Sequence, residues 1–238
     1  MSILLKHNIK LLVCDMAGTV INENGIIYKS IGTTLKKMGY YVSPEDEKSW
    51  HGREKRAVLF DHIYKQCGDI PETKYMIPEV NKAEKLLIEE LEKNYFKNNQ
   101  IKLIDENLLN FFDKLRMDNV KIALNTGYPK SLQNKIITNL NLEDRIDGFI
   151  SSEEVEYGRP APYMIHRLME RFEISSVDNV AKIGDTANDM LEGKNAGCKL
   201  TIGVLSGADK KEDLLEHSNL VINKITDLDK KDLPVFLL

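Results

Sequence analysis

The sequence has few cysteines, no long apolar run and no excess of one charge. Its three cysteines, Cys14, Cys67 and Cys198, are odd in number and show no paired spacing. This argues against a disulfide framework or a zinc site and for a reducing compartment. No segment approaches the length of a membrane span, and the N-terminal stretch lacks a small-residue cleavage pattern, so we expect a cytoplasmic protein with no membrane partner. The 33 basic and 37 acidic residues are interspersed, which leaves no one-sign field for binding nucleic acid.

The chain does contain enough apolar residues, 42% of 238, to bury a full core. Short β-branched or apolar runs alternate with longer amphipathic stretches that end at turn or capping residues. This alternation predicts an α/β fold in which a parallel sheet is connected by crossover helices. The expected strands are 10–14, 121–125, 148–151, 180–183, 200–204 and 220–222, and the expected helices are 108–115, 132–140, 162–172 and 190–196.

Residues 22–100 interrupt this alternation, because they offer no convincing strand but several helix signals. Ser43 followed by Pro44 is typical of a helix start, and the polar run 93–100 is expected to be a linker that returns to the sheet. We therefore predict a core of residues 1–21 and 101–238 with a helical insert at 22–100. The expected helices of the insert are 29–37, one beginning after Ser43, 53–64 and 80–95.

Asp15 directly follows the first expected strand, and the tight Ala17-Gly18 turn comes after it. A carboxylate exposed at such a position can attack an electrophile, although an aspartate that only caps a turn is as consistent with this segment alone. Thr126 follows the second expected strand and precedes Gly127, where a hydroxyl and backbone amides suit a phosphate oxygen. Open α/β sheets bind ligands at the carboxyl ends of their strands, which favours a site formed by both segments.

Two later segments add charge to this edge of the sheet. Arg159, in GRPAP, precedes a proline-initiated helix, where its guanidinium could hold a phosphate or simply lie on a surface loop. Asp185 and Asp189, in GDTAND, offer the hard oxygen ligands that Mg²⁺ takes in small number. Capping of the following helix is the alternative role for both carboxylates.

Four segments follow one another in the chain, with a helical insert after the first: DMAGT, the Thr126 turn, Arg159 and GDTAND. Together they resemble the four motifs of the haloacid dehalogenase-like hydrolase superfamily. The resemblance covers nearly the whole chain. It implies a Rossmann-like core with a C1-type helical cap, Mg²⁺ as cofactor, and an aspartate that is transiently phosphorylated. Asp15 would be this nucleophile, and Thr126 and Arg159 would hold the phosphoryl group. The metal would face Asp15, the Ala17 carbonyl and Asp185, with support from Asp189.

Ala17 is a departure, because phosphatases of this superfamily carry a second aspartate there that protonates the leaving group. General acid help is typically worth about 10²–10⁴-fold, and a methyl group cannot give it. The form DxAGT instead resembles the phosphonoacetaldehyde hydrolase branch, the phosphonatases, in which a cap lysine forms a Schiff base with the substrate aldehyde. Gly52 and Lys55 match the cap motif glycine-x-x-lysine of that branch, and Tyr128 in NTGY is also similar.

The pairing of Ala17 with Lys55 is chemically consistent. An iminium on Lys55 would accept the electrons of a breaking P–C bond, so no acid would be needed at position 17. We expect Arg53, Arg56 and cap closure to lower the pKa of Lys55. The remaining residues expected to line the substrate site are Gly18, Thr19, Gly127 and His51. We expect His51 to share a helix face with Lys55, where it is either a proton carrier or a structural residue.

Other positions differ from the phosphonatases, and the substrate therefore stays open. Val20, His51 and Val58 stand where those enzymes have threonine, methionine and histidine. Lys55 either forms an imine or binds a distal phosphate or carboxylate as an ion pair. Three hypotheses remain: a hydrolase that cleaves the P–C bond of a small phosphonate, a phosphomonoesterase of the phosphoglycolate phosphatase or β-phosphoglucomutase-like kind, and a non-catalytic phosphometabolite-binding protein. The resemblance also allows a homodimer, and implies hinges near 20–23 and 98–101.

Overall fold

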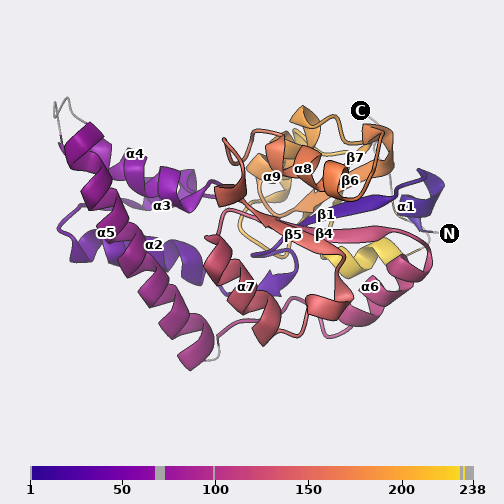
Figure 1. The fold of residues 1–238 in the computed structure, drawn as a ribbon, viewed down its shortest axis with the longest axis horizontal. Helices are drawn as coiled ribbons and strands as arrows, with labels where there is room; N and C mark the ends of the chain where they lie inside the picture. The colour runs from indigo at the N-terminus through magenta and orange to yellow at the C-terminus, as the bar shows by residue number, and fades with distance from the viewer. Residues whose placement is uncertain (1, 68–72, 99, 231–232, 234–238) are drawn as a thin grey trace.

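Six parallel strands form a twisted sheet at the centre of the larger of two lobes (Figure 1). The computed structural model describes residues 2–67, 73–98, 100–230 and 233. The strand order is β5-β4-β1-β6-β7-β8, so that the first strand lies in the middle. The strands are β1 (Leu11–Asp15), β4 (Lys121–Thr126), β5 (Gly148–Ser151), β6 (Val180–Gly184), β7 (Leu200–Val204) and β8 (Leu220–Ile222). The predicted α/β class and all six predicted strands are confirmed.

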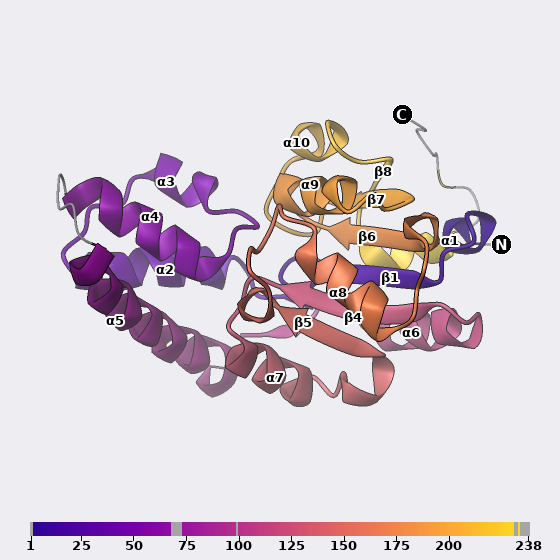
Figure 2. The same ribbon diagram turned by 45° about the horizontal axis from the view of Figure 1, so that its top comes forward.

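Helices cover both faces of this sheet (Figures 1 and 2). On one face, α6 (Leu108–Met117) and α7 (Lys130–Asn139) share a buried apolar cluster with Leu12 and Cys14 of β1. On the other, α8 (Tyr163–Arg171) packs with Leu11 and Val13, and α9 (Ala187–Asn195) lies beside it. Side chains alternate along a strand, so Asp15 belongs to the face of α8 and α9, and Cys14 points the other way, as expected.

Short elements complete the larger lobe. Its surface carries two short helices and four single 3₁₀ turns, none of which contributes to the sheet. They are α1 (Ile3–Lys6), α10 (Lys211–Leu215), η2 (Glu143–Arg145), η3 (Ser152–Glu154), η4 (Val177–Asn179) and η5 (Ile225–Asp229).

The smaller lobe is helical and forms the cap (Figure 2). It consists of α2 (Ile26–Lys37), α3 (Pro44–Ser49), α4 (Lys55–Cys67), α5 (Thr73–Glu92) and the π-helix η1 (Lys93–Lys97). Ser43 caps α3 in a reciprocal capping box with Asp46, which confirms the predicted helix start. The chain enters and leaves the cap through an antiparallel pair of strands, β2 (Ile21–Asn22) and β3 (Lys102–Leu103). Each strand has two residues, which is too short for a periodic pattern in the sequence to predict it.

The expected return linker at 93–100 was wrong, since Lys93–Lys97 continues α5 as a π-helix. Tyr95 inside this run is fully buried, and its hydroxyl contacts the hydroxyl of Tyr128 and the carboxylate of Glu23. One buried aromatic therefore anchors a segment whose composition is otherwise polar. Asn99 lies outside the described residues, and the two hinges expected beside this strand pair stay a prediction.

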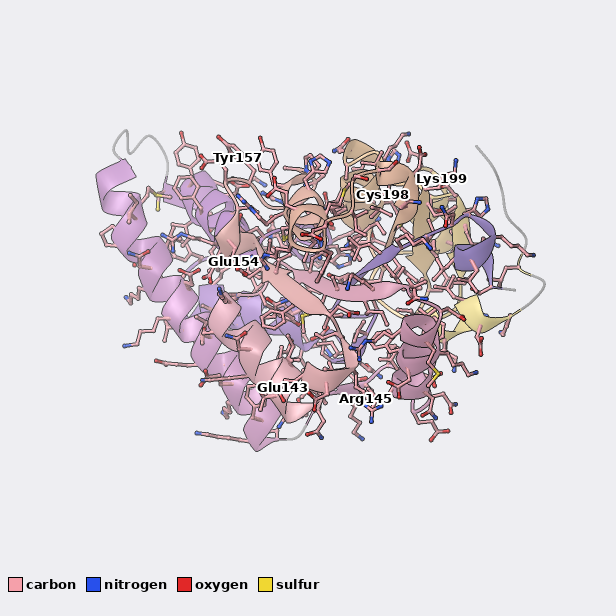
Figure 3. All side chains as sticks on the ribbon, turned by 45° about the vertical axis from the view of Figure 1, so that its right-hand side comes forward. Glu143, Arg145, Glu154, Tyr157, Cys198 and Lys199 are labelled. Carbon is pink, nitrogen blue, oxygen red and sulfur yellow. The ribbon has the colours of Figure 1, made fainter. Side chains whose placement is uncertain are left out.

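Glu154 fixes the start of the loop that carries Arg159 (Figure 3). Its carboxylate accepts from the Ser151 backbone N–H at 3.0 Å, and lies 3.1 Å from both Lys130 of α7 and Arg171 of α8. Each exposed pair alone is worth about 0–1 kcal/mol. Together they join two helices to the end of β5.

The described residues include no helix that combines the length and the apolar character needed to cross a membrane. The three cysteines are free and belong to separate parts of the fold. Cys14 is in β1, Cys67 ends α4, and Cys198 follows α9 beside Lys199 (Figure 3). Burial raises the pKa of the Cys14 thiol, which makes it an inert core residue.

Candidate active site

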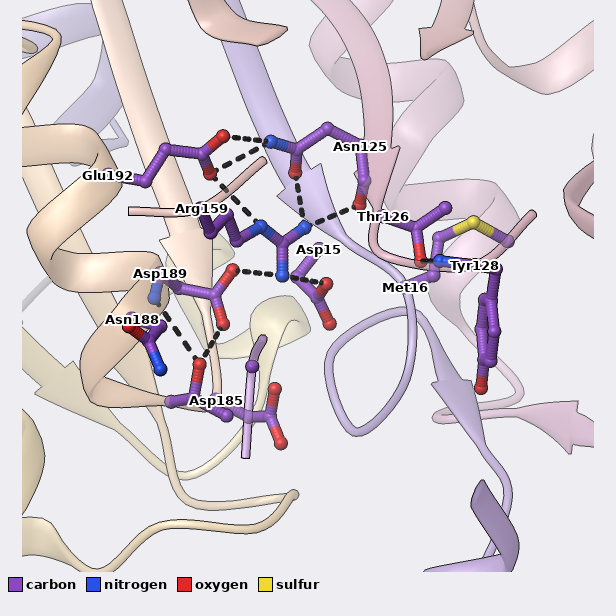
Figure 4. Close-up of polar contacts among 12 residues, drawn as sticks. Asp15, Met16, Asn125, Thr126, Tyr128, Arg159, Asp185, Asn188, Asp189 and Glu192 are labelled. Carbon is purple, nitrogen blue, oxygen red and sulfur yellow. Dashed lines mark hydrogen bonds and ion pairs between the residues drawn. The ribbon is translucent and has the colours of Figure 1, made fainter. Parts of the chain in front are cut away.

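The polar residues singled out from the sequence gather at the carboxyl ends of the central strands (Figure 4). Asp15 ends β1, Thr126 ends β4, and Asp185 directly follows β6. Carboxylate oxygens of Asp15, Asp185 and Asp189 all lie within 4.8 Å of one another. Because parallel strands end at the same edge of the sheet, segments more than 100 residues apart form one buried acidic cluster.

Arg159 lies at the centre of this cluster. Its Nη1 is 2.6 Å from Asp15 Oδ1 and 2.8 Å from Asp189 Oδ1, and its Nε is 3.2 Å from Glu192 Oε2. Its Nη2 donates to the backbone and side-chain oxygens of Asn125, at 2.8 and 2.9 Å. The guanidinium is buried and held at every nitrogen, so it presents a fixed positive charge beside Asp15.

Lys182 is a second buried cation, which the sequence analysis did not identify. Its Nζ lies 2.6 Å from Asn125 Oδ1, 2.9 Å from Asp189 Oδ1 and 3.1 Å from Glu192 Oε2. Burial alone would raise the pKa of Asp189, but Arg159 and Lys182 outweigh it and hold that pKa below its usual value. A lysine inside the apolar strand run VAKIG, and a glutamate three residues after Asp189, are the sequence signals that could have found this network.

The acidic cluster suits a divalent cation. Burial raises the pKa of Asp185, and the neighbouring Asp15 and Asp189 raise it further; burial also raises the pKa of Asp15, although Arg159 opposes it. A hard cation among these oxygens would relieve that repulsion, which is the donor chemistry Mg²⁺ prefers. One oxygen of Asp189 accepts from the Thr186 hydroxyl at 2.5 Å, so Asp189 fits the supporting position better than the direct one.

The turn after Asp15 approaches the second acidic segment closely. Gly18 has φ +80°, and a Cβ there would clash with the carboxylate of Asp185. Its carbonyl accepts from the Ser206 hydroxyl at 2.6 Å. Glycine at 18 is therefore required both by the backbone conformation and by the contact. Ala17 lines the cavity beside this turn, and Thr19 is fully buried.

Lys55, the first residue of α4, reaches the site from the cap. Its Nζ donates to the Arg53 carbonyl at 2.9 Å and lies 5.4 Å from the centre of the Tyr28 ring. Burial lowers its pKa to about 8, while attraction from Asp15 opposes the shift. About a tenth of the amine is thus neutral at pH 7 and about half at pH 8, and the neutral form is the nucleophile.

Of the expected causes of this lowered pKa, the one that was wrong is the influence of Arg53 and Arg56, whereas burial agrees with the expected effect of the cap. Arg53 forms an ion pair with Asp61, and Arg56 with Glu84, so both guanidinium groups are neutralised on the cap surface. Burial is the main cause, and the cation that contributes is Arg159 from the core. The sequence could not reveal this, because which charges surround Lys55 depends on how the cap packs on the sheet.

The segment before α4 packs onto the GDTAND segment. Gly52 has φ +67°, and a Cβ there would clash with the side chain of Thr186. The Asn188 amide donates to the His51 carbonyl at 2.8 Å. His51 lies in a turn, not on the helix with Lys55, so the predicted helix-face pairing was wrong. Its Nδ1 instead lies 2.7 Å from Oδ1 of Asp209.

A hydrogen-bonded chain behind Lys55 also escaped the sequence analysis. The Tyr128 hydroxyl lies 2.8 Å from that of Tyr95, which donates to Glu23 Oε2 at 3.2 Å. Thr126 Oγ1 accepts from the Tyr128 backbone N–H at 3.2 Å. Next to it, a Cβ on Gly127 would lie 3.0 Å from the Arg53 carbonyl, so the core turn and the cap loop are in close contact.

A cavity of about 480 Å³ opens between the cap and these strand ends, a size suited to a small metabolite. A groove of about 540 Å³ near Arg116 and Asp147 lies at the amino ends of the strands, at the opposite edge of the sheet from Asp15 and Asp185. The cavity at the site is lined by Ala17, Gly18, Asn22, Glu23, Asn24, Gly25, Tyr28, His51, Asp185, Ser206, Gly207 and Ala208.

Residues 12–203 match the model of the haloacid dehalogenase-like hydrolase family. The chain belongs to this family, which confirms the resemblance of its four motifs. It is 26% identical over 242 residues to a bifunctional phosphonoacetaldehyde hydrolase/aminoethylphosphonate transaminase of Clostridioides difficile, covering 95% of this chain and 35% of that protein. A phosphonoacetaldehyde hydrolase of Parabacteroides distasonis is 37% identical over 97 residues, 40% of this chain and 36% of that protein.

The matches thus span about a third of the length of these curated relatives. Among solved structures, a phosphonoacetaldehyde hydrolase-like protein from Oleispira antarctica superposes with a TM-score of 0.74 at 17% identity. It covers 95% of this chain and 96% of that one. At this identity the likeness concerns the fold, which agrees with the expected Rossmann-like core and helical cap.

Proposed function

We propose that this chain is a Mg²⁺-dependent hydrolase that transfers the phosphoryl group of a small phosphonate or phosphorylated metabolite to Asp15, and then to water. The observation that carries the proposal is a buried lysine of the cap, Lys55, whose pKa responds to the charge of Asp15, at a site where residue 17 is alanine. Burial lowers the pKa of Lys55 to about 8, and the carboxylate of Asp15 is the first charge that opposes this shift. The favoured substrate is a phosphonate with a carbonyl group two bonds from phosphorus.

The core residues would bind and activate the phosphoryl group. Arg159 supplies a fixed cation beside Asp15, and Thr126 with the Gly127 backbone supplies neutral donors at the next strand end. Asp15, Asp185 and the Ala17 carbonyl would hold Mg²⁺, with Asp189 in support. The bound ion would neutralise phosphoryl oxygens and keep Asp15 ionised. Asp15 can then attack phosphorus with one carboxylate oxygen.

Lys55 would stabilise the carbon leaving group so that the P–C bond can break. Its neutral amine adds to the substrate carbonyl, loss of water gives an imine, and uptake of a proton on the imine nitrogen gives an iminium. As Asp15 attacks phosphorus, the P–C bond breaks and its electron pair passes through carbon to the iminium nitrogen, leaving an enamine. The enamine is protonated on carbon and hydrolysed, which frees Lys55 and an aldehyde. Water then attacks the aspartyl-phosphate and releases inorganic phosphate, so no acid at position 17 takes part.

Borohydride trapping tests this proposal. Incubation with phosphonoacetaldehyde and borohydride should inactivate the protein and leave a reduced adduct on Lys55, located by peptide mass spectrometry. Lys55→Arg should form no adduct, whereas Asp15→Asn should still form the adduct but release no phosphate. Full activity in borohydride at saturating substrate, with no adduct, would refute the imine.

A second candidate is a phosphomonoesterase, because Lys55 with a pKa of about 8 is still largely protonated at pH 7. A charged lysine would bind a distal carboxylate or phosphate of the substrate as an ion pair. Ala17→Asp restores an acid two residues after Asp15 and should then raise ester turnover. A fall in turnover would argue against this alternative.

The homodimer expected from the resemblance stays a prediction, which light scattering after size-exclusion chromatography tests.

A further inference from the structure

His51 and Asp209 form a dyad that bridges the cap and the core. They are 158 positions apart in sequence, and His51 Nδ1 lies 2.7 Å from Asp209 Oδ1. The other carboxylate oxygen of Asp209, Oδ2, accepts from the Ala187 backbone N–H at 2.8 Å. A carboxylate fixed at both oxygens selects the tautomer in which Nδ1 carries its proton. Nε2 has no hydrogen-bond partner in the part of the chain that the structure describes.

The imidazole ring is held against the cavity wall. The Tyr28 ring packs against it with centroids 4.6 Å apart, and the Asn188 amide holds the His51 carbonyl from the core side. His51 borders the same cavity as Ala17 and Asp185. Fixed backbone, fixed tautomer and a free second nitrogen are what a positioned proton carrier needs.

Among the described residues bordering the cavity, four side chains titrate: Glu23, Tyr28, His51 and Asp185. Glu23 Oε2 already accepts from the Ile27 N–H at 2.7 Å and from a tyrosine hydroxyl. Burial raises the pKa of the Tyr28 phenol well above its usual value, which makes it a weak acid. Asp185 belongs to the proposed metal site. His51 is therefore the side chain best placed to exchange a proton with a substrate.

We propose that His51, oriented by Asp209, donates the proton that the leaving group needs and that alanine at position 17 cannot supply. This inference rests on the proposed function, in which Asp15 attacks phosphorus. With an ester, His51 enters the step as the imidazolium, which carries a proton on both nitrogens. The electron pair of the breaking P–O bond goes to the leaving oxygen, which takes the proton from Nε2. Neutral His51 then accepts a proton from the attacking water, while the Asp15–phosphorus bond breaks and its pair returns to the carboxylate. With a carbonyl phosphonate, Nε2 gives its proton to the enamine carbon.

His51→Asn distinguishes proton transfer from a purely structural role of the dyad in holding the cap on the core. The asparagine amide can keep the hydrogen bond to Asp209 but has no group in place of Nε2. The paired substrates are 4-nitrophenyl phosphate, whose leaving group departs as a stable anion, and phenyl phosphate, whose phenol has a pKa of about 10. We expect kcat on phenyl phosphate to fall by about 10²-fold or more. The fall on 4-nitrophenyl phosphate should be much smaller. Equal falls on both substrates, or none, would mean that the dyad only docks the cap.

If the wild-type protein turns over phosphonoacetaldehyde but neither ester, the same variant is tested on that substrate. His51→Asn should then form the borohydride adduct on Lys55 at the wild-type rate, since the imine needs no proton from the dyad, yet release phosphate at least tenfold more slowly. A parallel loss of adduct and turnover would overturn the role of His51.

Two further variants complete the test. Asp209→Asn should show the same dependence on the leaving group as His51→Asn, but with a smaller loss, because it removes the orientation and not the proton carrier. Glu212→Gln, which removes an exposed carboxylate nearby on α10, should change neither substrate. Wild-type protein that is inactive on all three substrates refutes the proposed function itself, and the proton donor with it. Activity without any leaving-group dependence in His51→Asn refutes the donor alone.

Discussion

Lys182 Nζ lies 2.9 Å from Asp189 Oδ1, and neither side chain is exposed to solvent at all. The lysine belongs to the strand that leads into the acidic cluster, and the aspartate to the helix that follows. Burying two charges is costly unless they are paired and hydrogen-bonded. Here Glu192 and Arg159 complete the pairing, so the network holds the charged groups of the site away from solvent.

Lys182→Met should therefore destabilise the fold strongly. It leaves Asp189 and Glu192 with Arg159 as their remaining buried cation, and we expect a loss of about 3–5 kcal/mol in the free energy of unfolding. Urea denaturation at pH 7 measures it. Lys199→Met, at an exposed lysine 3.8 Å from Asp178, is the matched control and should cost less than about 1 kcal/mol. Equal stability of the two variants would contradict the role of the buried network.

Gly52→Ala should disturb the contact between the cap and the core, and so lower activity, more than it lowers the stability of either lobe. Gly52 and Gly25 have nearly the same φ, +67° and +69°, but a Cβ meets Thr186 at Gly52 and open space at Gly25. Both variants pay about 1–2 kcal/mol for the left-handed backbone. We expect kcat/KM to fall at least tenfold further in Gly52→Ala than in Gly25→Ala. Equal kinetics in the two variants would show that the contact with Thr186 does not matter.

The rate of borohydride inactivation should depend on pH through Lys55. A pKa lowered from 10.5 to about 8 means that the amine is mainly protonated below pH 8 and mainly neutral above it. Since the neutral amine attacks the carbonyl, the rate should rise about tenfold per pH unit below pH 8 and then level off. A profile that keeps rising toward pH 10 would show that the amine is exposed to solvent when substrate binds.

Asp185→Asn should stabilise the metal-free protein and abolish its response to Mg²⁺. The pKa of Asp185 is raised, so ionisation at pH 7 opposes folding, and its removal should add roughly 0.5–2 kcal/mol. The asparagine oxygen can still accept from the Ala208 N–H, which lies 2.7 Å from Oδ2. Wild-type protein should gain about 2.7 kcal/mol at a Mg²⁺ concentration 100 times Kd. Thermal unfolding with and without chelator measures both effects, and a Mg²⁺ response retained in the variant would exclude Asp185 as a ligand.

The sequence by itself determined the sheet, the helical insert and the acidic segments, because each is encoded in residues close together along the chain. Strand periodicity located β1 and β4, and the capping signal at Ser43 located α3. Asp15, Thr126, Asp185 and Asp189 could be predicted to meet because parallel strands end at one edge. The polar run around Tyr95 misled, since local composition does not report that one side chain in it is buried.

The tertiary structure alone decided which charges surround these residues. The strand run VAKIG marks Lys182 as unusual, but its partners come from β4 and α9 and are visible only in the structure. The low pKa of Lys55 follows from burial beneath the cap and from Arg159, not from its neighbours in sequence. His51 and Asp209 meet across 158 positions, and Tyr95 reaches Glu23 across 72. Electrostatic and hydrogen-bonding environments depend on distances in space, and a linear pattern fixes such distances only within one element or along one sheet edge.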